Sequence, residues 1–187
     1  MSPLSEMSLS LHKPFEEDIS AIRAATGEDA HRLVDSRMDF YQTQIAAGWL
    51  DAPANVDEWV KQSTAGIIRG PRNCVLIAEN AEGMVGYVFA ARKIVPNSRT
   101  PMIASIEEIY VDPRHRCQGL ARRLFEAALI NCRSSEVERV QLRIMAENAT
   151  GRTFWSSMGF REKIVICELG QAKHDQSILK TIKTIDC

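Results

Sequence analysis

The sequence predicts a mixed α/β fold, in which helices cover the faces of a central sheet. Residues 106–129 run from a β-branched strand through a basic loop that contains glycine into an amphipathic helix. Two short apolar strands at 75–78 and 85–91 flank a turn, which predicts a hairpin. Residues 139–145 alternate polar and apolar side chains, the pattern of a half-buried strand.

The N-terminal third begins with a polar segment. Residues 1–18 show no sustained period, so we expect a tail or loosely attached edge segment before a single domain of residues 19–187. A first strand is expected at 19–25. Thr26 then offers a hydroxyl N-cap with acids in the following turn, which predicts a helix to about Ala47. A second helix is expected from Asp57 to about Ile68.

The remaining elements follow from breakers and periodicity. Gly86, inside the second strand of the hairpin, predicts a bulge or a close approach of a ligand. The central strand should end at about Asp112, because Pro113 cannot continue the hydrogen-bond ladder. Further elements are expected in order: a helix from Leu120 to about Cys132, a strand at 139–145, a helix at 148–158, and strands at 162–168 and 178–185.

Composition narrows the class of protein. The 187 residues are 45% hydrophobic, enough for one buried core, and the net charge of -1 argues against a general nucleic-acid binder. The five cysteines are scattered without a C-x-x-C pair, which favours reduced thiols. No apolar run approaches the roughly 20 residues that span a bilayer, and the start lacks signal-peptide features. A cytoplasmic protein is expected, with no membrane partner.

The loop before the predicted helix at Leu120 has the features of an anion site. The first N–H groups of a helix lack intrahelical partners and carry partial positive charge, and Gly119 lets a ligand approach closely. Cations are disfavoured in a first helical turn, yet this segment gathers five basic residues, which a bound phosphate would explain. The alternative is a solvated basic helix start. The basic residues are Arg114, His115, Arg116, Arg122 and Arg123.

Residues 116–121, RCQGLA, resemble the Q/R-x-x-G-x-G/A signature of the GNAT superfamily, the acyl-CoA-dependent N-acetyltransferases. Residues 142–160, LRIMAENATGRTFWSSMGF, resemble the family's strand, Asn and helix that ends in Gly-Phe. The resemblance extends over about residues 22–169. It implies a mixed α/β (α+β) fold with a splayed central sheet of about six to seven strands flanked by about four helices.

The resemblance also implies acetyl-CoA as cosubstrate and a set of residues that bind it. The main chain of the central strand should pair with the pantetheine arm and polarise the thioester carbonyl, and the loop amides should hold the pyrophosphate. Asn148 should hydrogen-bond the pantetheine or cap its helix, while Arg152 is placed to reach the nucleotide end. The strand positions are Ile109, Tyr110 and Val111, and the loop positions are Arg116, Cys117, Gln118, Gly119, Leu120, Ala121 and Arg122.

Glu107 and Glu108 lie where family members often carry a carboxylate that takes the amine proton. Successive strand side chains face opposite ways, so only one points at a given cleft unless a bulge intervenes. Glu107 is the preferred base, because its expected face is shared with aliphatic Ile109 and Val111, and desolvation raises a carboxyl pKa. For Glu108, the alternative is a solvated position beside Tyr110.

One residue departs from the family pattern: Trp155 stands where a tyrosine is common, and that phenol often protonates the departing thiolate. An indole N–H cannot serve as a general acid, so Trp155 is expected to shape the pocket or donate a hydrogen bond. The sequence thus predicts transfer of an acetyl group to a primary amine of a small molecule or a protein N-terminus. The alternative is an acyl-CoA-binding regulatory module with little or no turnover. No metal site is expected, and a homodimer is compatible with the exposed faces.

Overall fold

The computed structural model describes residues 21–50, 54–99, 101–133 and 137–167. Within the chain, residues 1–152 and 153–187 form two compact units, which are described separately. The expected tail at 1–18 and the expected strand at 178–185 lie outside the described residues, and the single domain stays a prediction.

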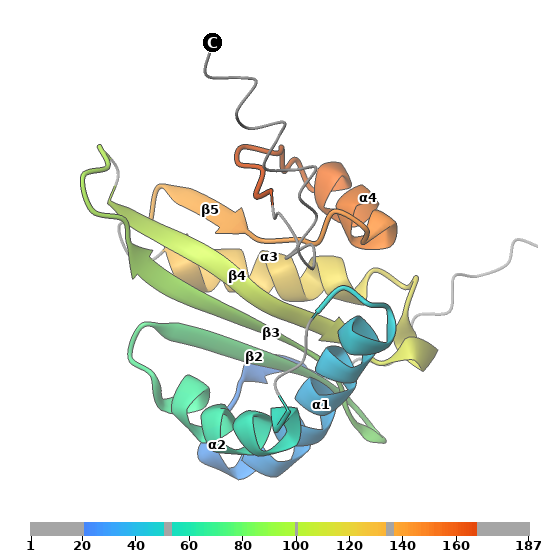
Figure 1. Ribbon diagram of the computed structural model, residues 1–187. Coiled ribbons are helices and arrows are strands. Elements are labelled where there is room, and N and C mark those ends of the chain that lie inside the picture. Colours follow the sequence, from blue (N-terminus) through green and yellow to red (C-terminus); the bar gives the residue numbers. More distant parts are fainter. Residues whose placement is uncertain (1–20, 51–53, 100, 134–136, 168–187) are drawn as a thin grey trace, which may run out of the picture. The chain divides into compact units, whose positions relative to one another are not determined.

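The first unit is built on a five-stranded sheet in the order β1-β2-β3-β4-β5 (Figure 1). The first four strands are antiparallel, and β5 runs parallel to β4. This described sheet is smaller than the six to seven strands expected. Its strands are β1 (Ala21–Ala24), β2 (Asn73–Asn80), β3 (Gly83–Ile94), β4 (Met102–Val111) and β5 (Arg139–Leu142).

The β2–β3 hairpin forms where the sequence predicts it. Asn80 Oδ1 accepts hydrogen bonds from the N–H groups of Glu82 and Gly83, so the side chain closes its own turn. Gly86 marks a close approach, because a Cβ there would lie 2.7 Å from the main-chain oxygen of Tyr110. A register shift lies opposite, between Ala78 and Glu79.

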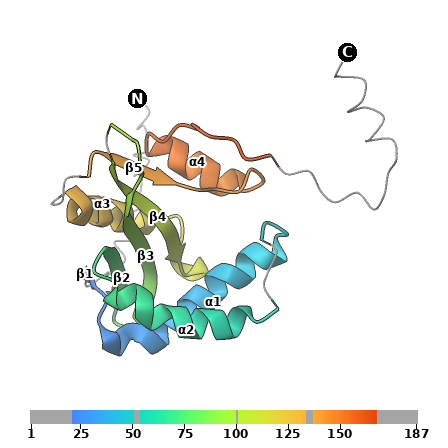
Figure 2. The same ribbon diagram turned by 60° about the vertical axis from the view of Figure 1, so that its left-hand side comes forward.

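Helices cover both faces of the sheet, as Figures 1 and 2 show. The helices α1 (Ala30–Ala46) and α2 (Val56–Arg69) pack together on one face, and α3 (Leu120–Arg133) lies on the other. The core beneath α1 joins Leu33 to side chains of β2, β3 and β4, namely Val75, Ile77, Tyr87 and Tyr110.

A charged cluster ties the start of α1 to β1 and β2. Asp29 is 1% exposed and accepts hydrogen bonds from Arg23 Nη1 at 2.8 Å and Arg32 Nη2 at 2.6 Å, and from the N–H and hydroxyl of Thr26. Both arginines also pair with Glu79 on β2. The hydrogen bond from Arg23 is the main reason that the pKa of Asp29 lies well below its usual range.

Asp29→Asn is expected to lower the free energy of unfolding at pH 7 by about 1–2 kcal/mol, since the arginines are partly exposed and screened. A depressed folded-state pKa gives stability that is present above the unfolded value of 3.8 and is lost as pH falls below it. Urea unfolding at pH 7, 5 and 2.5 checks this. The difference between the two proteins should be equal at pH 7 and 5 and smaller at pH 2.5; a difference that is constant to pH 2.5 would contradict it.

Two strand predictions need correction. The predicted strand at 162–168 is wrong for its described part, because residues 161–167 form no regular secondary structure. The apolar run Ile164, Val165 and Ile166 suggested a strand, but no described strand pairs with it. The strand expected at 139–145 ends at Leu142, where its pairing with β4 ends.

The helix α4 (Ala149–Ser157) begins in the first unit and ends in the second. Its C-terminal end is closed by Gly159, whose φ of +88° lets the N–H of Phe160 donate to the carbonyl of Trp155 at 3.0 Å. In the second unit, Trp155 packs edge to face on Phe154 and Phe160, at ring centroid distances of 4.8 and 5.2 Å.

Candidate active site

A β-bulge in β4 places the two candidate carboxylates. Glu108 pairs with Phe89 of β3 and Ile106 pairs with Ala90, so Glu107 is an extra residue without an opposite partner. Strict alternation would put Glu107 and Glu108 on opposite faces. The bulge breaks this alternation, and Glu108 therefore does not share the face of Ile106.

Glu108 is not a solvated strand residue but lies buried, 5% exposed, under α1. Arg37 of α1 binds its carboxylate with two parallel hydrogen bonds, from Nε at 2.9 Å and Nη2 at 2.8 Å. The hydroxyls of Tyr41 and Tyr87 donate to the same carboxylate at 2.8 and 2.9 Å. Each oxygen accepts two hydrogen bonds, so the acceptor capacity of Glu108 is taken up inside the fold.

Arg37 connects three elements through this network. Besides binding Glu108, its Nη1 donates to the hydroxyls of Thr64 at 2.8 Å and Ser63 at 3.0 Å on α2. The guanidinium also lies over the ring of Trp59, 5.5 Å from the centroid. Hydrogen bonding and the charge of Glu108 outweigh burial and raise the pKa of Arg37, while burial and the same charge raise the pKa of the Tyr41 and Tyr87 hydroxyls.

Glu107 has different surroundings. Its carboxylate lies beside Lys93 of β3, with Oε1 2.5 Å from Nζ, and the two side chains are 21% and 44% exposed. Oε1 itself is buried and accepts no hydrogen bond of good geometry from the described residues. The expected aliphatic surroundings are therefore wrong, because the bulge turns Glu107 towards a cation. Oε1 is thus held against the lysine ammonium, and a ligand can reach only the exposed part of the Glu107 side chain.

Beyond the bulge, one edge of β4 is open. Its pairing with β5 ends at Ile106 and Leu142, and no described strand lies beside residues 107–111 on that side. Ile109, Tyr110 and Val111 therefore present main-chain groups at an unpaired edge, the arrangement that an extended ligand can extend as an added strand. The Tyr110 hydroxyl donates to Asp39 Oδ2 at 3.2 Å, and burial, with the charge of Asp39, raises the pKa of Tyr110 to about 12.

The loop between β4 and α3 has the backbone of an anion-binding turn. Cys117 and Gly119 both have positive φ, +62° and +81°, and a Cβ at Gly119 would meet no atom within 4 Å. Residues 116–119 are exposed, and Leu120 and Ala121 begin α3. The open space at Gly119 and the helix start fit a diphosphate held by main-chain N–H groups.

Two arginines of this loop bind protein groups, and two at the start of α3 do not form ion pairs with described residues. Arg114 pairs with Asp112 and is the main cause that lowers the pKa of Asp112 to about 2. The Nε of Arg116 donates to the carbonyl of Val111 at 2.9 Å, which anchors the end of β4. Arg122 and Arg123 are exposed on the first turn of α3 and form no ion pair with a described residue. They are the cations best placed for an anionic ligand.

Near the start of α4, Asn148 acts as the N-cap, because its Oδ1 accepts from the N–H of Gly151 at 2.8 Å. Arg152 Nη1 donates to the carbonyl of Ala146 at 3.2 Å, so the guanidinium contacts the preceding loop. Trp155 belongs to the second unit. Asn148 and Arg152 thus have local partners, and their contacts with a cosubstrate stay predictions.

Sequence reasoning missed Arg37 and Lys93. Arg37 lies on the same helical stripe as Leu33, Phe40 and Tyr41, four residues after the first and three before the second. A cation on an otherwise apolar stripe could have marked it as a buried, paired residue. Lys93 carried no signal, because its meeting with Glu107 depends on the hairpin register and the bulge.

A separate groove of about 320 Å³ is lined by residues that include Cys74 of β2, Arg92 of β3 and Cys132 of α3. Burial raises the pKa of the Cys74 thiol to about 11, so the thiol stays protonated at neutral pH. The groove contains neither Glu107 nor the Gly119 loop. Among the described helices, none has the length and apolar character to cross a membrane.

Comparison with known proteins gives a consistent result. Residues 71–162 match the model of the acetyltransferase (GNAT) domain. An uncharacterized N-acetyltransferase of Methanocaldococcus jannaschii is 30% identical over 82 residues, which are 44% of this chain and only 36% of that protein. This match thus spans about a third of the relative's length.

Two solved structures share the fold. A tetramutant of the BH1408 protein of Bacillus halodurans is 19% identical with a TM-score of 0.71, over 80% of this chain and 98% of that one. A predicted acetyltransferase of Clostridium acetobutylicum, solved with acetyl-CoA, is 18% identical with a TM-score of 0.67, over 83% and 98%. With the match from the hairpin to α4 and the open β4 edge followed by the Gly119 turn, residues 71–162 form an acetyltransferase (GNAT) domain.

Proposed function

We propose that the protein transfers the acetyl group of acetyl-CoA to a primary amine by direct attack of the amine. One observation carries the proposal: a single strand, β4, has the Glu107 carboxylate at its bulge, an unpaired edge beyond it, and the Gly119 turn after its end. Glu107 takes the role of general base. Glu108 is assigned a structural role, because four hydrogen bonds already occupy its oxygens.

In the proposed reaction, the turn, the strand and Glu107 have separate roles. The turn at residues 116–122 holds the pyrophosphate, and the main chain of Ile109, Tyr110 and Val111 binds the pantetheine arm and orients the thioester carbonyl. Acetyl-CoA supplies the acetyl thioester. Glu107 takes a proton from the acceptor ammonium, directly or through water, and the neutral amine then forms the C–N bond as the C–S bond breaks. The new amide nitrogen loses its second proton to water, and the thiolate that leaves takes up a proton, so the products are the N-acetyl amide and the CoA thiol.

The source of that last proton is water in this proposal. Trp155 holds the position where the family commonly has tyrosine, and an indole N–H does not act as an acid. A thiol with a pKa near 8.5 is a tolerable leaving group without an acid catalyst. Within the second unit, the packing of Trp155 between Phe154 and Phe160 supports a structural role for the indole ring.

Trp155 also motivates the second candidate, an acyl-CoA-binding regulatory module. A thiol-release assay with acetyl-CoA and a panel of primary amines separates the two. The enzyme is expected to release thiol with at least one amine and to form the N-acetyl product. Tight binding of acetyl-CoA, measured by calorimetry, without product from any amine would support the regulatory module. A cytoplasmic location and a homodimer stay predictions.

Gly119→Ala is expected to weaken CoA binding by about tenfold, because a residue with a side chain at positive φ costs about 1–2 kcal/mol and the turn relaxes. Gly48→Ala is the matched control, since Gly48 has a φ of +70° and also has nothing within 4 Å of a Cβ. Both variants should lose similar thermal stability. Calorimetry should show a higher Kd for CoA in the Gly119 variant alone, and equal Kd values in all three proteins would argue against the diphosphate site.

A further inference from the structure

The ion pair between Lys93 and Glu107 bears on which amine the protein accepts. Lys93 carries a primary ammonium group 2.5 Å from Oε1 of the proposed base. An acceptor ammonium that approaches Glu107 meets a carboxylate that is already neutralised by a cation of the same chemical kind. Oε1 is buried against Lys93, whereas the Glu107 side chain as a whole is 21% exposed, so the acceptor N–H meets the exposed part of the carboxylate.

The neighbouring surface is basic. Lys93 pairs with Ile103 of β4, which pairs with Arg139 of β5, so the two cations belong to one row across the sheet. Arg139 donates to the Ser98 hydroxyl at 3.2 Å. Arg143 directly follows the last residue of β5, and residues 139, 141 and 143 are all exposed. Lys93 contacts Glu107, and two further cations, Arg139 and Arg143, lie in and just after the strand next to β4, although the whole chain has a net charge of -1.

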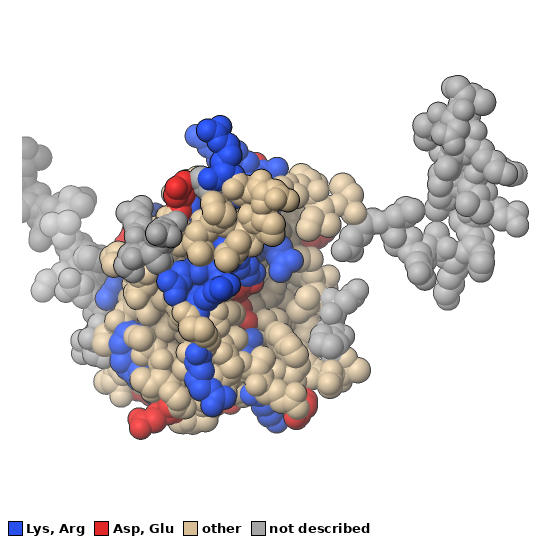
Figure 3. Space-filling view, turned by 90° about the vertical axis from the view of Figure 1, so that its left-hand side faces the viewer, with Lys and Arg blue, Asp and Glu red and all other residues tan. Residues whose placement is uncertain are grey.

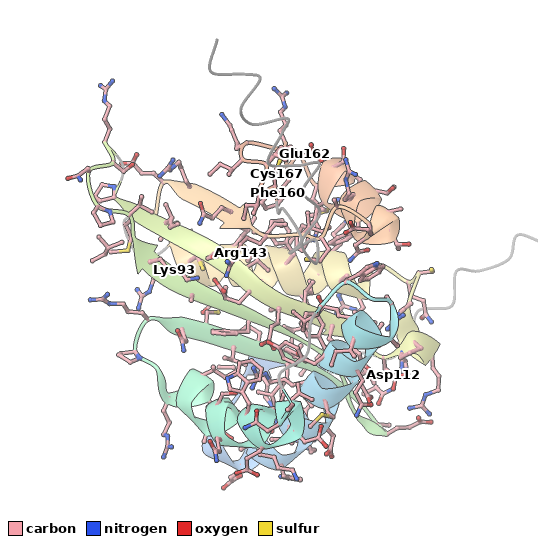
Figure 4. All side chains as sticks on the ribbon, viewed as in Figure 1. Lys93, Asp112, Arg143, Phe160, Glu162 and Cys167 are labelled. Atoms are coloured by element: carbon pink, nitrogen blue, oxygen red, sulfur yellow. The ribbon has the colours of Figure 1, made fainter. Side chains whose placement is uncertain are left out.

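The figures agree with this distribution. Lys93 and Arg143, both labelled in Figure 4, lie over the part of the sheet formed by β3, β4 and β5, away from α1 and α2. Figure 3 views the molecule from the side of the β3–β4 loop, and Lys and Arg side chains gather near the middle of this face beside a hollow in which acidic atoms are visible.

An acceptor with only an ammonium group is poorly suited to this surface. When the acceptor ammonium binds Glu107, the ammonium of Lys93 loses its partner. It then faces the like charge of the acceptor. An anionic group on the acceptor removes this penalty, because it can pair with Lys93 while the acceptor ammonium pairs with Glu107. The short distance between Nζ and Oε1 requires that the two charged groups of the acceptor lie close together.

From this charge pattern, and resting on the proposed function, we propose that the acceptor is a zwitterionic amine of the α-amino-acid type. Glu107 binds and deprotonates its ammonium, and Lys93 binds its carboxylate. Arg139 and Arg143 add a positive field that favours the anionic group. Lys93 is thus a specificity-determining residue.

The experiment compares matched acceptors with the full-length protein and acetyl-CoA. Each of several α-amino acids is assayed beside its carboxamide and beside the amine that lacks the carboxyl group. The values of kcat/KM are corrected for the fraction of each acceptor that is a neutral amine at the assay pH. The corrected kcat/KM is expected to be at least about tenfold higher for the amino acid, the size of effect that one hydrogen bond between charged groups contributes. The difference should lie mainly in KM, because the carboxylate contact positions the substrate.

Variants assign the preference to Lys93. Lys93→Gln should abolish the preference for the carboxylate, and Lys93→Arg should keep most of it. Lys61→Gln, which removes the same charge from an exposed position on α2, should leave the preference unchanged. Acetylation of amines with equal kcat/KM for all three acceptor forms, or a preference that survives in Lys93→Gln, overturns this proposal and leaves the acetyltransferase activity intact. Absence of thiol release with every amine and amino acid instead overturns the proposed function.

Discussion

Arg37→Met is expected to lower the free energy of unfolding by about 3–5 kcal/mol, the largest effect on stability of any single change considered. The substitution keeps much of the side-chain volume but leaves the buried Glu108 carboxylate without its cation. It also leaves the hydroxyls of Thr64 and Ser63 on α2 without the donor that joins them to α1. Urea unfolding followed by far-UV circular dichroism at pH 7 measures the loss.

A second pair of variants separates charge from packing. Glu108→Gln preserves shape but leaves Arg37 as an uncompensated buried cation, so a loss of similar size is expected. In the double variant Arg37→Met with Glu108→Leu, no charge remains buried, and the loss should be smaller than the sum of the single losses. Two outcomes would show that the pair does not hold α1 on β4. One is a double variant whose loss in free energy of unfolding equals the sum of the single losses, and the other is a urea midpoint of Arg37→Met equal to that of the unmodified protein.

Glu107→Gln is expected to reduce kcat/KM for the acceptor by about 10²- to 10⁴-fold, the usual contribution of a positioned general base. The variant should fold with nearly unchanged stability, since Glu107 is partly exposed and pairs with a half-exposed lysine. The proposed mechanism requires the carboxylate form of the base, so the unmodified protein should lose activity at low pH. In the variant this acidic limb should vanish, and only the ionisation of the amine should remain in the profile.

The control for this prediction is the neighbouring residue. Glu108→Gln removes a carboxylate one position away, yet its main effect should be on unfolding, and the folded fraction should retain the acidic limb of the unmodified enzyme. A pH profile that is unchanged by Glu107→Gln and altered by Glu108→Gln would assign the base to Glu108 and require Arg37 to move during turnover.

Local signals in the sequence were sufficient for most of the fold. Asn80 and Gly83 close the hairpin with their own main-chain and side-chain groups, and the stripe of α3 from Leu120 follows from its apolar period. The turn at Gly119 was also predictable, because only the residue itself and the helix after it determine its conformation. The segment at 162–168 was misjudged because a strand needs a partner, which a short apolar run does not specify.

The surroundings of the two glutamates were not predictable in the same way. Glu108 meets Arg37, which lies 71 residues away in sequence, and Glu107 meets Lys93 only because the register with β3 shifts by one residue. The alternation rule assumes a regular ladder, and no residue type in the segment Ile106 to Ile109 marks the position where the ladder is broken. A pair of adjacent identical residues therefore acquired unlike environments from long-range contacts.

The unpaired place of Glu107 in β4 has a consequence for how the strand tolerates changes in length. Ile106 and Glu108 already occupy consecutive rungs opposite Ala90 and Phe89, so excision of residue 107 would leave a regular antiparallel ladder on that side. The neighbouring parallel strand would be undisturbed too, since its last rung is at Ile106. A shortened chain of this kind should still assemble its sheet while lacking the carboxylate, which makes the chemistry of this strand depend on a residue that the architecture can omit.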